Sequence, residues 1–254
     1  MTEFDVLMEM YRSIITDAED DRQAVELILE RLCSDLPAGV AAVNNEGKFI
    51  KLSLQERFNP FGREEGENID TVFSEQLNEL REDVINASMD ALAVRTAPKN
   101  MLKDYRICVF LLEAFNSRFG SLMVFVKGGE FTDDQITLCR CISVLISLIM
   151  REKYSRESLE RKRKLENVKA VSETLSYSEL MAAVSIFKEL EGNEGLIVAS
   201  RIADSEGITR SVIVNAIRKL EGAGIIESRS LGMKGTYIKV LNEYFTEEML
   251  KIKK

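Results

Sequence analysis

The sequence predicts an α+β protein in which two domains are joined by a long helix. Its 254 residues, 45% hydrophobic and 30% charged, are enough for two modest globular domains. Strand-like segments occur near both ends of a mixed first half, and the last third reads as two short helices followed by two strands. We therefore expect an antiparallel sheet with helices in residues 1–134, a linker helix in 135–174 and a winged helix-turn-helix in 175–254.

The first half opens with two helices, because apolar residues recur at helical spacing in residues 4–15 and 22–36 and Pro37 then stops the second run. Residues 39–43 and 48–52 flank an Asn- and Gly-rich tetrapeptide that suits a hairpin turn. Residues 106–112 and 121–127 are β-rich and apolar, and residues 113–120 join them. An antiparallel sheet packed by helices is typical of a GAF or PAS domain, although the pattern also allows other α+β folds.

A long helix follows, with Thr132-Asp133-Asp134 as its cap and an end near Val171. Its first part is apolar and fits either a dimer bundle with the opening helix or packing against the sheet of the same subunit. Its second part, residues 151–164, is almost wholly charged. The basic run 161–164 could contact DNA phosphate or a nucleotide, but we favour a solvent-exposed helix face.

Residues 198–241 indicate a helix-turn-helix with a wing. Ser200 can cap a short first helix, Gly207 supplies the positive φ of a tight turn, and Thr209 can cap the second helix. That helix, residues 210–221, turns four apolar residues inward at helical spacing: Ile213, Ala216, Ile217 and Leu220. Residues 225–229 and 236–241 are strand-like around a Gly-rich turn, which makes a basic hairpin.

The outward residues of this region suit duplex DNA, since Arg can present a fork to guanine and Asn to adenine, while hydroxyls and basic groups suit phosphate oxygens. The candidate DNA-binding residues are Ser200, Arg201, Thr209, Arg210, Ser211, Val212, Val214, Asn215, Arg218, Lys219, Arg229 and Lys234. The alternative is a helical domain whose two helices are joined by a Gly turn with no role in DNA binding. The cap, turn, polar outer face and basic wing in succession favour DNA binding.

Composition narrows the function further. The chain has no histidine, which removes the commonest general base and metal ligand, so we expect neither an enzyme nor a metal site. Its four cysteines lie among apolar neighbours and predict reduced core or interface residues. No segment is long and apolar enough to cross a membrane and the first residues are acidic, so we expect a cytoplasmic protein. The net charge of −8 divides into about −11 for residues 1–150 and about +3 for the remainder, which leaves the DNA-binding end basic.

Four segments carry a resemblance to a known family: Leu175-Ser176-Tyr177-Ser178-Glu179-Leu180, Gly192-Asn193-Glu194-Gly195-Leu196, Gly207-Ile208-Thr209-Arg210-Ser211-Val212-Ile213-Val214-Asn215-Ala216, and the run from Glu227 to Asn242. Together they resemble the CodY family. The resemblance implies a dimeric, nutrient-sensing transcription regulator of Gram-positive bacteria. Its N-terminal GAF domain would bind branched-chain amino acids (isoleucine, valine or leucine), GTP would be a second effector, and the winged helix would bind an AT-rich palindromic operator of metabolic genes.

The resemblance is fainter in the first half. Where the family has an Asn-Asp-Arg-Met motif, whose arginine would hold the ligand carboxylate, this chain has Arg57-Phe58-Asn59-Pro60-Phe61-Gly62-Arg63. Arg63 and Arg57 are the candidates for that role, because an arginine can pair with a carboxylate through two hydrogen bonds. Val94 and Thr96 fall near two pocket positions. Because the motif is missing, the alternative is that this half has lost amino acid and GTP sensing, serving in dimerisation or protein interaction or binding another ligand.

For GTP, the resemblance implies a Ser-Arg-Arg-Gly-Lys turn and a glutamate at the start of the linker helix. Here the turn is Asn44-Asn45-Glu46-Gly47-Lys48, and the glutamate is Glu152. Lys48 and Glu152 carry over, but both arginines are replaced and Glu46 would repel phosphate. We therefore expect the response to GTP to be reduced or missing.

Overall fold

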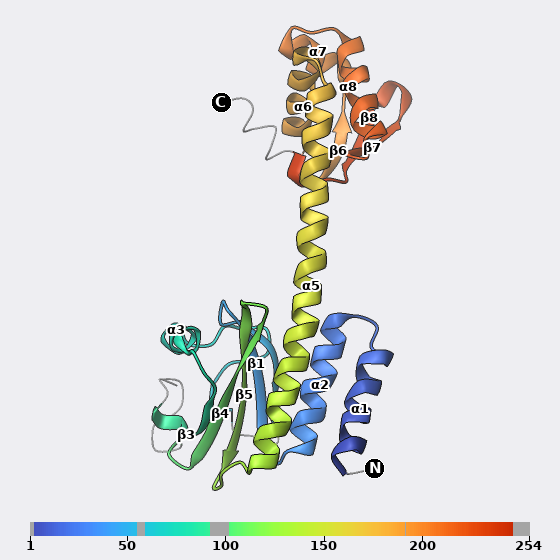
Figure 1. Cartoon of the computed structure of the whole chain (residues 1–254). Coiled ribbons are helices and arrows are strands. Elements are labelled where there is room, and N and C mark those ends of the chain that lie inside the picture. The colour runs from blue at the N-terminus through green and yellow to red at the C-terminus, as the bar shows by residue number, and fades with distance from the viewer. Residues whose placement is uncertain (1–2, 55–58, 92–101, 191, 246–254) are drawn as a thin grey trace. The chain divides into compact units, whose positions relative to one another are not determined.

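The computed structural model describes residues 3–54, 59–91, 102–190 and 192–245, and its contacts divide the chain into two compact units, Met1–Ser155 and Arg156–Lys254 (Figure 1). The division falls inside a single long helix, which the sequence analysis set apart as a linker. The last turns of this helix therefore pack with the second unit. Among the described residues, no helix combines the length and apolar character needed to cross a bilayer.

The first unit begins with α1 (Glu3–Asp17) and α2 (Asp21–Asp35), as predicted. The Asp20 side chain caps α2 by accepting from the Gln23 backbone N–H at 2.8 Å, and Leu36, directly before Pro37, is the C-cap of α2. Tyr11, which is fully buried, donates from its hydroxyl to Asp35 Oδ2 at 3.0 Å and so fastens α1 to the end of α2.

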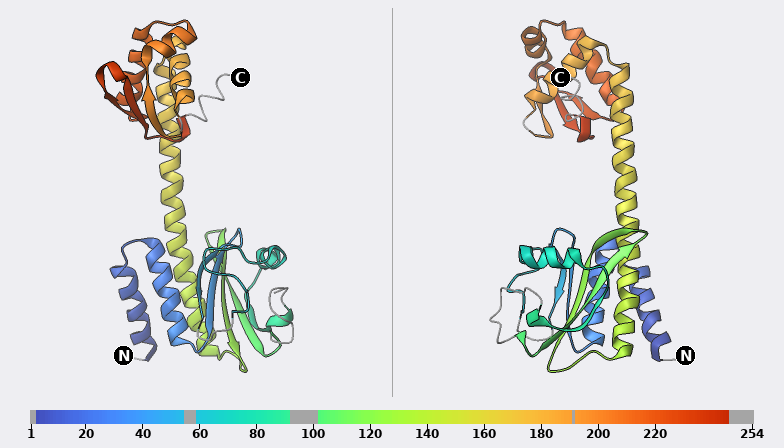
Figure 2. Two further views of the ribbon diagram at one scale, coloured as in Figure 1. Left: turned by 180° about the vertical axis from the view of Figure 1, so that it is seen from behind. Right: turned by 60° about the vertical axis from the view of Figure 1, so that its left-hand side comes forward.

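Five strands form one antiparallel sheet: β1 (Gly39–Asn44), β2 (Phe49–Ser53), β3 (Val84–Ser88), β4 (Tyr105–Ala114) and β5 (Ser117–Lys127). Their order is β2-β1-β5-β4-β3, so the central strand β5 pairs with both β1 and β4. This order, with helices from the beginning and end of the unit on one face, is the arrangement of a GAF or PAS domain (Figure 2). The predicted α+β class is confirmed.

Two parts of this unit differ from the prediction. The connection expected at residues 113–120 is a two-residue turn, Phe115-Asn116, whose residues have φ angles of 50° and 63°. Two consecutive left-handed residues match the twist of a tight hairpin, so β4 and β5 extend almost to each other. The sequence analysis also missed α3 (Thr71–Glu79), β3 and the short helix η1 (Met89–Ala91).

The sheet has a core on each face. On one face, α2 and α5 cover residues such as Val40, Phe110 and Val124. On the other, Phe73 and Leu77 of α3 pack against Val109 and the remaining residues of a second apolar cluster. The sheet is thus buried on both faces, which explains why its central strands read as nearly continuous apolar runs.

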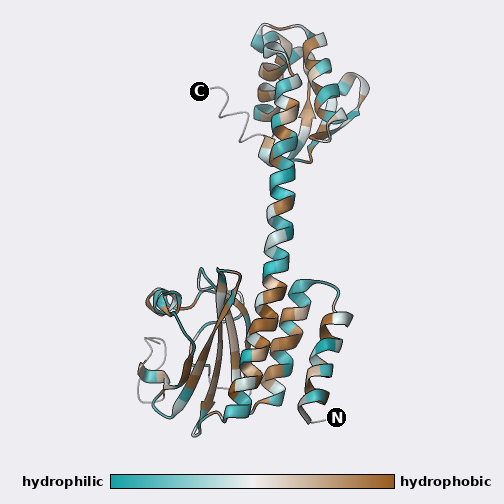
Figure 3. Ribbon diagram, in the orientation of Figure 1, coloured by the Kyte–Doolittle hydropathy of each residue, from teal (hydrophilic) through white to brown (hydrophobic). Residues whose placement is uncertain are grey.

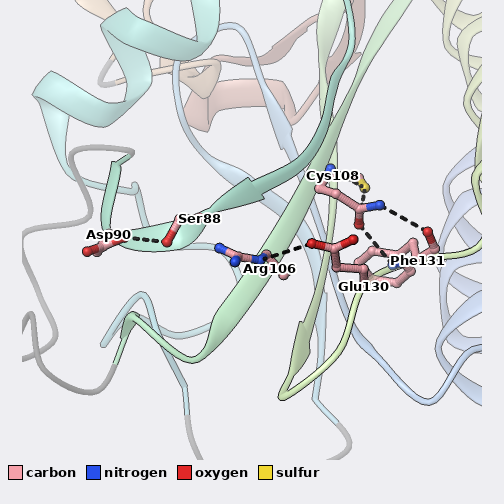
Figure 4. A network of polar contacts seen from close by, with 7 residues as sticks. Ser88, Asp90, Arg106, Cys108, Glu130 and Phe131 are labelled. Carbon is pink, nitrogen blue, oxygen red and sulfur yellow. Dashed lines mark hydrogen bonds and ion pairs between the residues drawn. The ribbon is translucent and has the colours of Figure 1, made fainter.

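A polar contact ties the edge strand β3 to the segment that leads into α5. The Asn86 amide donates from Nδ2 to the Phe131 carbonyl at 3.0 Å and accepts from the Phe131 N–H at 2.8 Å. Figure 4 shows this region, in which Cys108 accepts from the Asn86 N–H at 3.3 Å and Arg106 lies 3.7 Å from Glu130. Asn86 itself has a φ of 49°, and the register in which β3 pairs with β4 shifts between Val84 and Ala87.

Helix α5 spans Asp133–Thr174, about 63 Å at 1.5 Å per residue. Thr132 and Gln135 cap it reciprocally: Gln135 N–H donates to Thr132 Oγ1 at 3.4 Å and Thr132 N–H to Gln135 Oε1 at 3.0 Å. Figure 3 shows the predicted change from an apolar to a hydrophilic segment along the helix. Ile142 and Ile146 are fully buried in the first unit, so packing within one subunit accounts for that side of the helix.

The second unit contains α6 (Tyr177–Glu189), β6 (Glu194–Ile197), α7 (Ala199–Glu206), α8 (Arg210–Gly222), β7 (Ile226–Ser230), the short helix η2 (Gly232–Lys234) and β8 (Thr236–Val240). Strand β6, which was not predicted, pairs with β8 to make a three-stranded sheet of order β6-β8-β7. Val168 and Val171 of α5 belong to the same core as α6, α7 and α8. This core makes residues 156–245 one structural unit.

Candidate DNA-binding interface and effector site

The turn between α7 and α8 has the predicted geometry. Gly207 has φ 65° and ψ 30°, the left-handed conformation that glycine adopts without steric cost. The Ile208 N–H then donates to the Ala203 carbonyl at 3.0 Å, which closes the end of α7. Ala203 and Ile202 are buried beneath this turn. The small side chain of Ala203 thus allows the two helices to approach each other.

Helix α8 has one buried side and one exposed side. Ile213, Ala216, Ile217 and Leu220 are buried, which confirms the predicted inward set. The side chains of Arg210, Ser211, Asn215 and Arg218 are exposed. Within the described part of the chain, none of these four side chains makes a hydrogen bond or ion pair. The exposed side of α8 therefore presents two guanidinium groups, an amide and a hydroxyl to an outside partner.

The two valines predicted on the exposed side of α8 are less exposed than the polar residues. Val212 and Val214 are both half-buried, and Val212 packs against the core of the unit. Val214 can still offer methyl groups next to Ser211 and Arg218, where they would suit the methyl group of a thymine.

The predicted cap at Ser200 is wrong. Helix α7 begins at Ala199, and Val198 is its N-cap, because the chain leaves β6 and enters the helix directly, so that Val198 O accepts from the N–H groups of Arg201 and Ile202. Ser200 is exposed in the first turn. Thr209 does occupy the N-cap position of α8 with extended backbone, but its side chain makes no cap hydrogen bond. Both hydroxyls are therefore available to an external acceptor such as phosphate.

Two of the candidate basic residues have partners inside the chain. Arg201 makes an ion pair with Glu189 at the end of α6. Lys219 donates from Nζ to Glu179 Oε2 at 2.7 Å and to the Thr174 carbonyl at 3.0 Å. The sequence analysis grouped Lys219 with outward DNA-contacting residues, whereas the structure directs its ammonium group toward the junction of α5 and α6.

The wing depends on a glycine. Gly235 has φ 116° and ψ −156°, and a Cβ atom at this position would lie 2.3 Å from the carbonyl oxygen of Ile197. Its carbonyl accepts from the Leu231 N–H at 2.8 Å, which closes the turn between β7 and β8. The tight approach brings β8 against β6, where Ile197 pairs with Thr236. Only glycine satisfies both the backbone angles and this contact.

The side chains of the wing are available for contact. Arg229 of β7 and Lys234 of the turn are exposed, as is Lys239 of β8. Met233, at the tip, is fully exposed. Glu221 at the end of α8 accepts from the Ser228 N–H at 3.0 Å and from its hydroxyl at 2.9 Å, which ties the wing to the C-terminal end of α8.

In the first unit, a cluster of four aromatic rings occupies the sheet face that carries α3. Phe61 is buried and lies between the others, with ring centroids 5.5 Å from Phe49, 5.5 Å from Phe125 and 6.3 Å from Phe73. Phe61 belongs to the irregular segment that, in the sequence analysis, stands where the resemblance implies an Asn-Asp-Arg-Met motif. This segment therefore places an aromatic ring on the sheet.

A local turn directs Phe61 inward and leaves Arg63 outside. Asn59 Oδ1 accepts from the Phe61 N–H at 2.9 Å, and Asn59 Nδ2 donates to the Arg63 carbonyl at 2.7 Å. Gly62 between them has a φ of 59°. The Arg63 side chain is exposed. Arg57, Val94 and Thr96, the other effector candidates, lie outside the described residues.

The two nucleotide candidates are both exposed. Lys48 closes the turn between β1 and β2, where its backbone N–H donates to Asn44 Oδ1 at 2.9 Å, and Glu152 lies on α5. Within the ranges that the structure describes, no contact joins Lys48 to Glu152. The geometry thus provides two separate charged side chains rather than an assembled phosphate site.

The comparisons with known proteins agree with the geometry of the second unit. The sequence model of the CodY helix-turn-helix domain matches residues 193–253. The global transcriptional regulator CodY of Clostridium perfringens is 38% identical over 231 residues, covering 89% of this chain and 90% of that protein. CodY of Staphylococcus aureus is 36% identical over 257 residues, covering 99% of this chain and 97% of that protein. The chain belongs to the CodY family.

Membership of the CodY family makes the chain a DNA-binding transcriptional regulator, and the match covers nearly its full length. Among solved structures, the cofactor-binding GAF domain of the nutrient sensor CodY from Clostridium difficile covers 59% of this chain and 99% of that chain, at 13% identity and a TM-score of 0.42. A GAF domain from a phosphoenolpyruvate-protein phosphotransferase of Coxiella burnetii gives the same TM-score at 14% identity, covering 62% of this chain and 99% of that chain.

Sequence reasoning missed the structural role of Arg118. Its guanidinium donates to the carbonyls of Leu77 and Leu80 at 2.6 and 2.7 Å and to Ser121 Oγ at 3.1 Å. Arg118 thus binds the C-terminal end of α3, where unpaired carbonyls favour a cation. A half-buried arginine surrounded by acceptors is a structural clamp, and no local sequence pattern distinguishes it from a surface arginine.

Proposed function

We propose that this CodY-family regulator binds an operator in duplex DNA with the exposed side of α8 in the major groove and the wing on the adjacent backbone. The observation that supports this most strongly is the row of exposed polar side chains on α8 without intramolecular partners. Arg210, Asn215 and Arg218 would contact base edges. Ser200, Thr209, Arg229 and Lys234 would bind phosphate and set the register. Such a protein acts on chromosomal DNA, so we place it in the cytoplasm.

The first experiment is selection of bound genomic fragments, followed by titration of the enriched site and of random DNA at one salt concentration. Asn215→Ala and Arg210→Ala should lower affinity for the selected site while leaving the fold intact, each by about 1–3 kcal/mol. Lys153→Ala, an exposed residue of the first unit, is the matched control. Equal loss of affinity for the selected site and for random DNA would contradict base reading.

We further propose that the protein is a homodimer on an AT-rich palindrome. Two-fold operators require two copies of the reading helix. Val144 and Leu148, one turn apart on the first part of α5, are 57% and 46% exposed, which supplies an apolar strip that the subunit itself does not bury. Sedimentation of a Leu148→Glu variant should show monomers. A Tyr154→Glu variant, altered on the hydrophilic part of α5, is the control and should remain dimeric.

We propose that a branched-chain amino acid is the effector and that Arg63 binds its carboxylate from the segment over the sheet, with GTP as a weaker effector near Lys48 and Glu152. Calorimetric titration with isoleucine, valine, leucine and then GTP tests this, beside Arg63→Ala and the exposed control Arg81→Ala. Binding lost only in Arg63→Ala would support the assignment. Unchanged binding in Arg63→Ala would remove it.

A second candidate function is favoured by Phe61. Because this ring fills the space among Phe49, Phe73 and Phe125, the described residues on that face of the sheet pack against one another. The unit would then serve in dimerisation, protein interaction or binding of another ligand, and DNA binding would not depend on amino acids. Absence of heat in every titration, together with unchanged operator affinity when isoleucine is added, would support this function over nutrient sensing.

A further inference from the structure

The C-terminal end of α8 is attached directly to the last turns of α5. Asn167 Nδ2 donates to the Ala223 carbonyl at 3.0 Å, and Lys219 Nζ donates to the Thr174 carbonyl at 3.0 Å. Asn167 and Thr174 lie two turns apart on α5, and Lys219 of α8 lies one turn before Ala223, the C-cap of that helix. The two hydrogen bonds therefore join one side of α8 to one side of α5 at two levels.

The Lys219 contact is reinforced by a carboxylate at the start of α6. Glu179 Oε2 accepts from Lys219 Nζ at 2.7 Å and from the Ser176 N–H at 2.8 Å, and Glu179 N–H donates to Ser176 Oγ at 3.3 Å. The Glu179 side chain is only 10% exposed. The same carboxylate thus closes the capping box of α6 and holds the lysine of α8, so the ends of α5, α6 and α8 meet at one ion pair.

This junction lies at the opposite end of α8 from its first base-reading residue. Arg210 and Lys219 are nine residues apart, roughly 13 Å along the helix axis. A change of tilt at Lys219 would therefore be largest at Arg210, where the helix would enter the groove. Binding of bases requires hydrogen-bond geometry within a few tenths of an ångström. The orientation of the exposed side of α8, which would contact the bases, therefore depends on the contacts that hold the C-terminal end of this helix.

We propose that Lys219 and Asn167 are positioning residues, which fix α8 to the last turns of α5 so that residues 156–174 and the reading helix move as one body. In that case the connection at Leu175-Ser176 does not act as a hinge. The axis of the last turns of α5 then determines where the exposed side of α8 points. This proposal rests on the proposed reading of DNA by α8. It gives Lys219 a different role from the phosphate contact that its sequence position predicts.

The salt dependence of DNA binding separates the two roles of Lys219. A lysine bound to phosphate releases a counterion, so removing it lowers the slope of log affinity against log salt by about 0.9. A positioning lysine makes no phosphate contact, and its removal leaves the slope unchanged. Removal of a positioning lysine should instead weaken the operator complex more than the random-DNA complex, because only the operator complex depends on exact placement of base contacts.

The experiment measures operator and random-DNA affinity of the full-length protein at several salt concentrations. For Lys219→Met and Asn167→Ala, operator affinity should fall about tenfold, with random-DNA affinity changed less than about twofold and an unchanged slope. Lys234→Met, a lysine of the wing expected to bind phosphate, should lower the slope by about 0.9 and weaken both DNAs alike. A lowered slope in Lys219→Met, or unchanged operator affinity in both Lys219→Met and Asn167→Ala, would overturn the proposal.

Two further variants guard against a simple loss of folding. Lys219→Arg keeps a cation within reach of Glu179 and should recover part of the operator affinity. Random-DNA affinity within about twofold of wild type in Lys219→Met would show that the domain remains folded, because an unfolded domain would lose both complexes. Glu179→Gln should lower operator affinity in wild type and have little further effect in Lys219→Met, since the two residues act through one contact. If wild type itself failed to prefer the selected operator, the proposed function would fail instead, which distinguishes the two conclusions.

Discussion

The rings of Phe61 and Phe125 meet edge to face, with centroids 5.5 Å apart and an interplanar angle of 84°. Phe125 belongs to the central strand of the sheet, whereas Phe61 comes from an irregular segment between β2 and α3. Their contact therefore fixes that segment over the sheet. It also places an aromatic side chain of the protein itself among the rings on this face.

Phe61→Ala should destabilise the first unit by about 3–5 kcal/mol, because it removes a buried ring that contacts three others. The same change should increase affinity for isoleucine if the ring competes with the ligand. Urea denaturation and calorimetric titration measure the two effects. Phe115→Ala, at a ring that is 72% exposed and faces the Arg151 guanidinium at 3.8 Å, is the control and should change stability by less than about 1 kcal/mol. A loss below about 1 kcal/mol in Phe61→Ala would show that the ring is not essential to packing.

Gly235→Ala should unfold or strongly loosen the wing, since the new Cβ would meet the Ile197 carbonyl at 2.3 Å and the backbone has a φ of 116°. We expect a destabilisation of at least about 2 kcal/mol, with loss of operator affinity. Gly222→Ala in the last turn of α8 is the matched control: its Cβ meets nothing within 4 Å, and alanine favours the helix. Equal thermal stability of the two variants would refute the argument.

Glu179 should make the second unit sensitive to acid. The hydrogen bond from Lys219 and the contact with Ser176 hold the pKa of Glu179 below its ordinary value of 4.5. A lowered pKa in the folded state stabilises the fold above about pH 4.5, and that stabilisation is lost as the pH falls through the lowered value. The free energy of unfolding, measured between about pH 6 and 3, should therefore fall more steeply with decreasing pH for wild type than for Glu179→Gln. Parallel curves for the two proteins would exclude this role.

The cysteines should react unequally with alkylating reagents. Burial raises the pKa of the Cys139 thiol to about 12 and also raises those of Cys33 and Cys108, whereas Cys141 is half-exposed. The thiolate is the reactive form, so the three buried groups should be inert in the native protein. Mass spectrometry after brief labelling should find a single modified residue, Cys141, and four after denaturation. Rapid labelling of Cys139 would mean that α5 opens readily.

Much of the second unit could be predicted because its signals are local. Helical spacing identified Ile213 and Leu220 as core residues, and glycine chemistry identified the turn at Gly207. Strand β6 was missed because it has only four residues, one of them Gly195, and exists through pairing with β8, which lies 39 to 45 residues later. Strand β3 was missed for a similar reason: all its residues are half-buried, so no alternation marks it.

The candidate site shows the same limit at the level of side chains. Periodicity places Lys219 near the exposed side of α8, but its direction is set by Glu179, 40 residues earlier, and by a carbonyl at the end of α5. Likewise the sequence indicated that Phe61 lies in the segment with the lost motif and gave no sign that it is buried. Composition and spacing predict the type of surface on which a residue lies, whereas contacts with residues distant in the sequence determine where its side chain points.

The packing of α5 has a practical consequence for anyone who wishes to transplant the DNA-binding part of this regulator. Val168 and Val171 are only 1% and 5% exposed, so a fragment that starts at Leu175 would lack both valines, expose the core residues that they cover and lose the amide of Asn167. Such a fragment should aggregate or misfold. A DNA-binding fragment therefore has to begin near Arg156. Fusions to a foreign sensor should keep residues 156–174 and join the sensor within the charged part of α5 that precedes them.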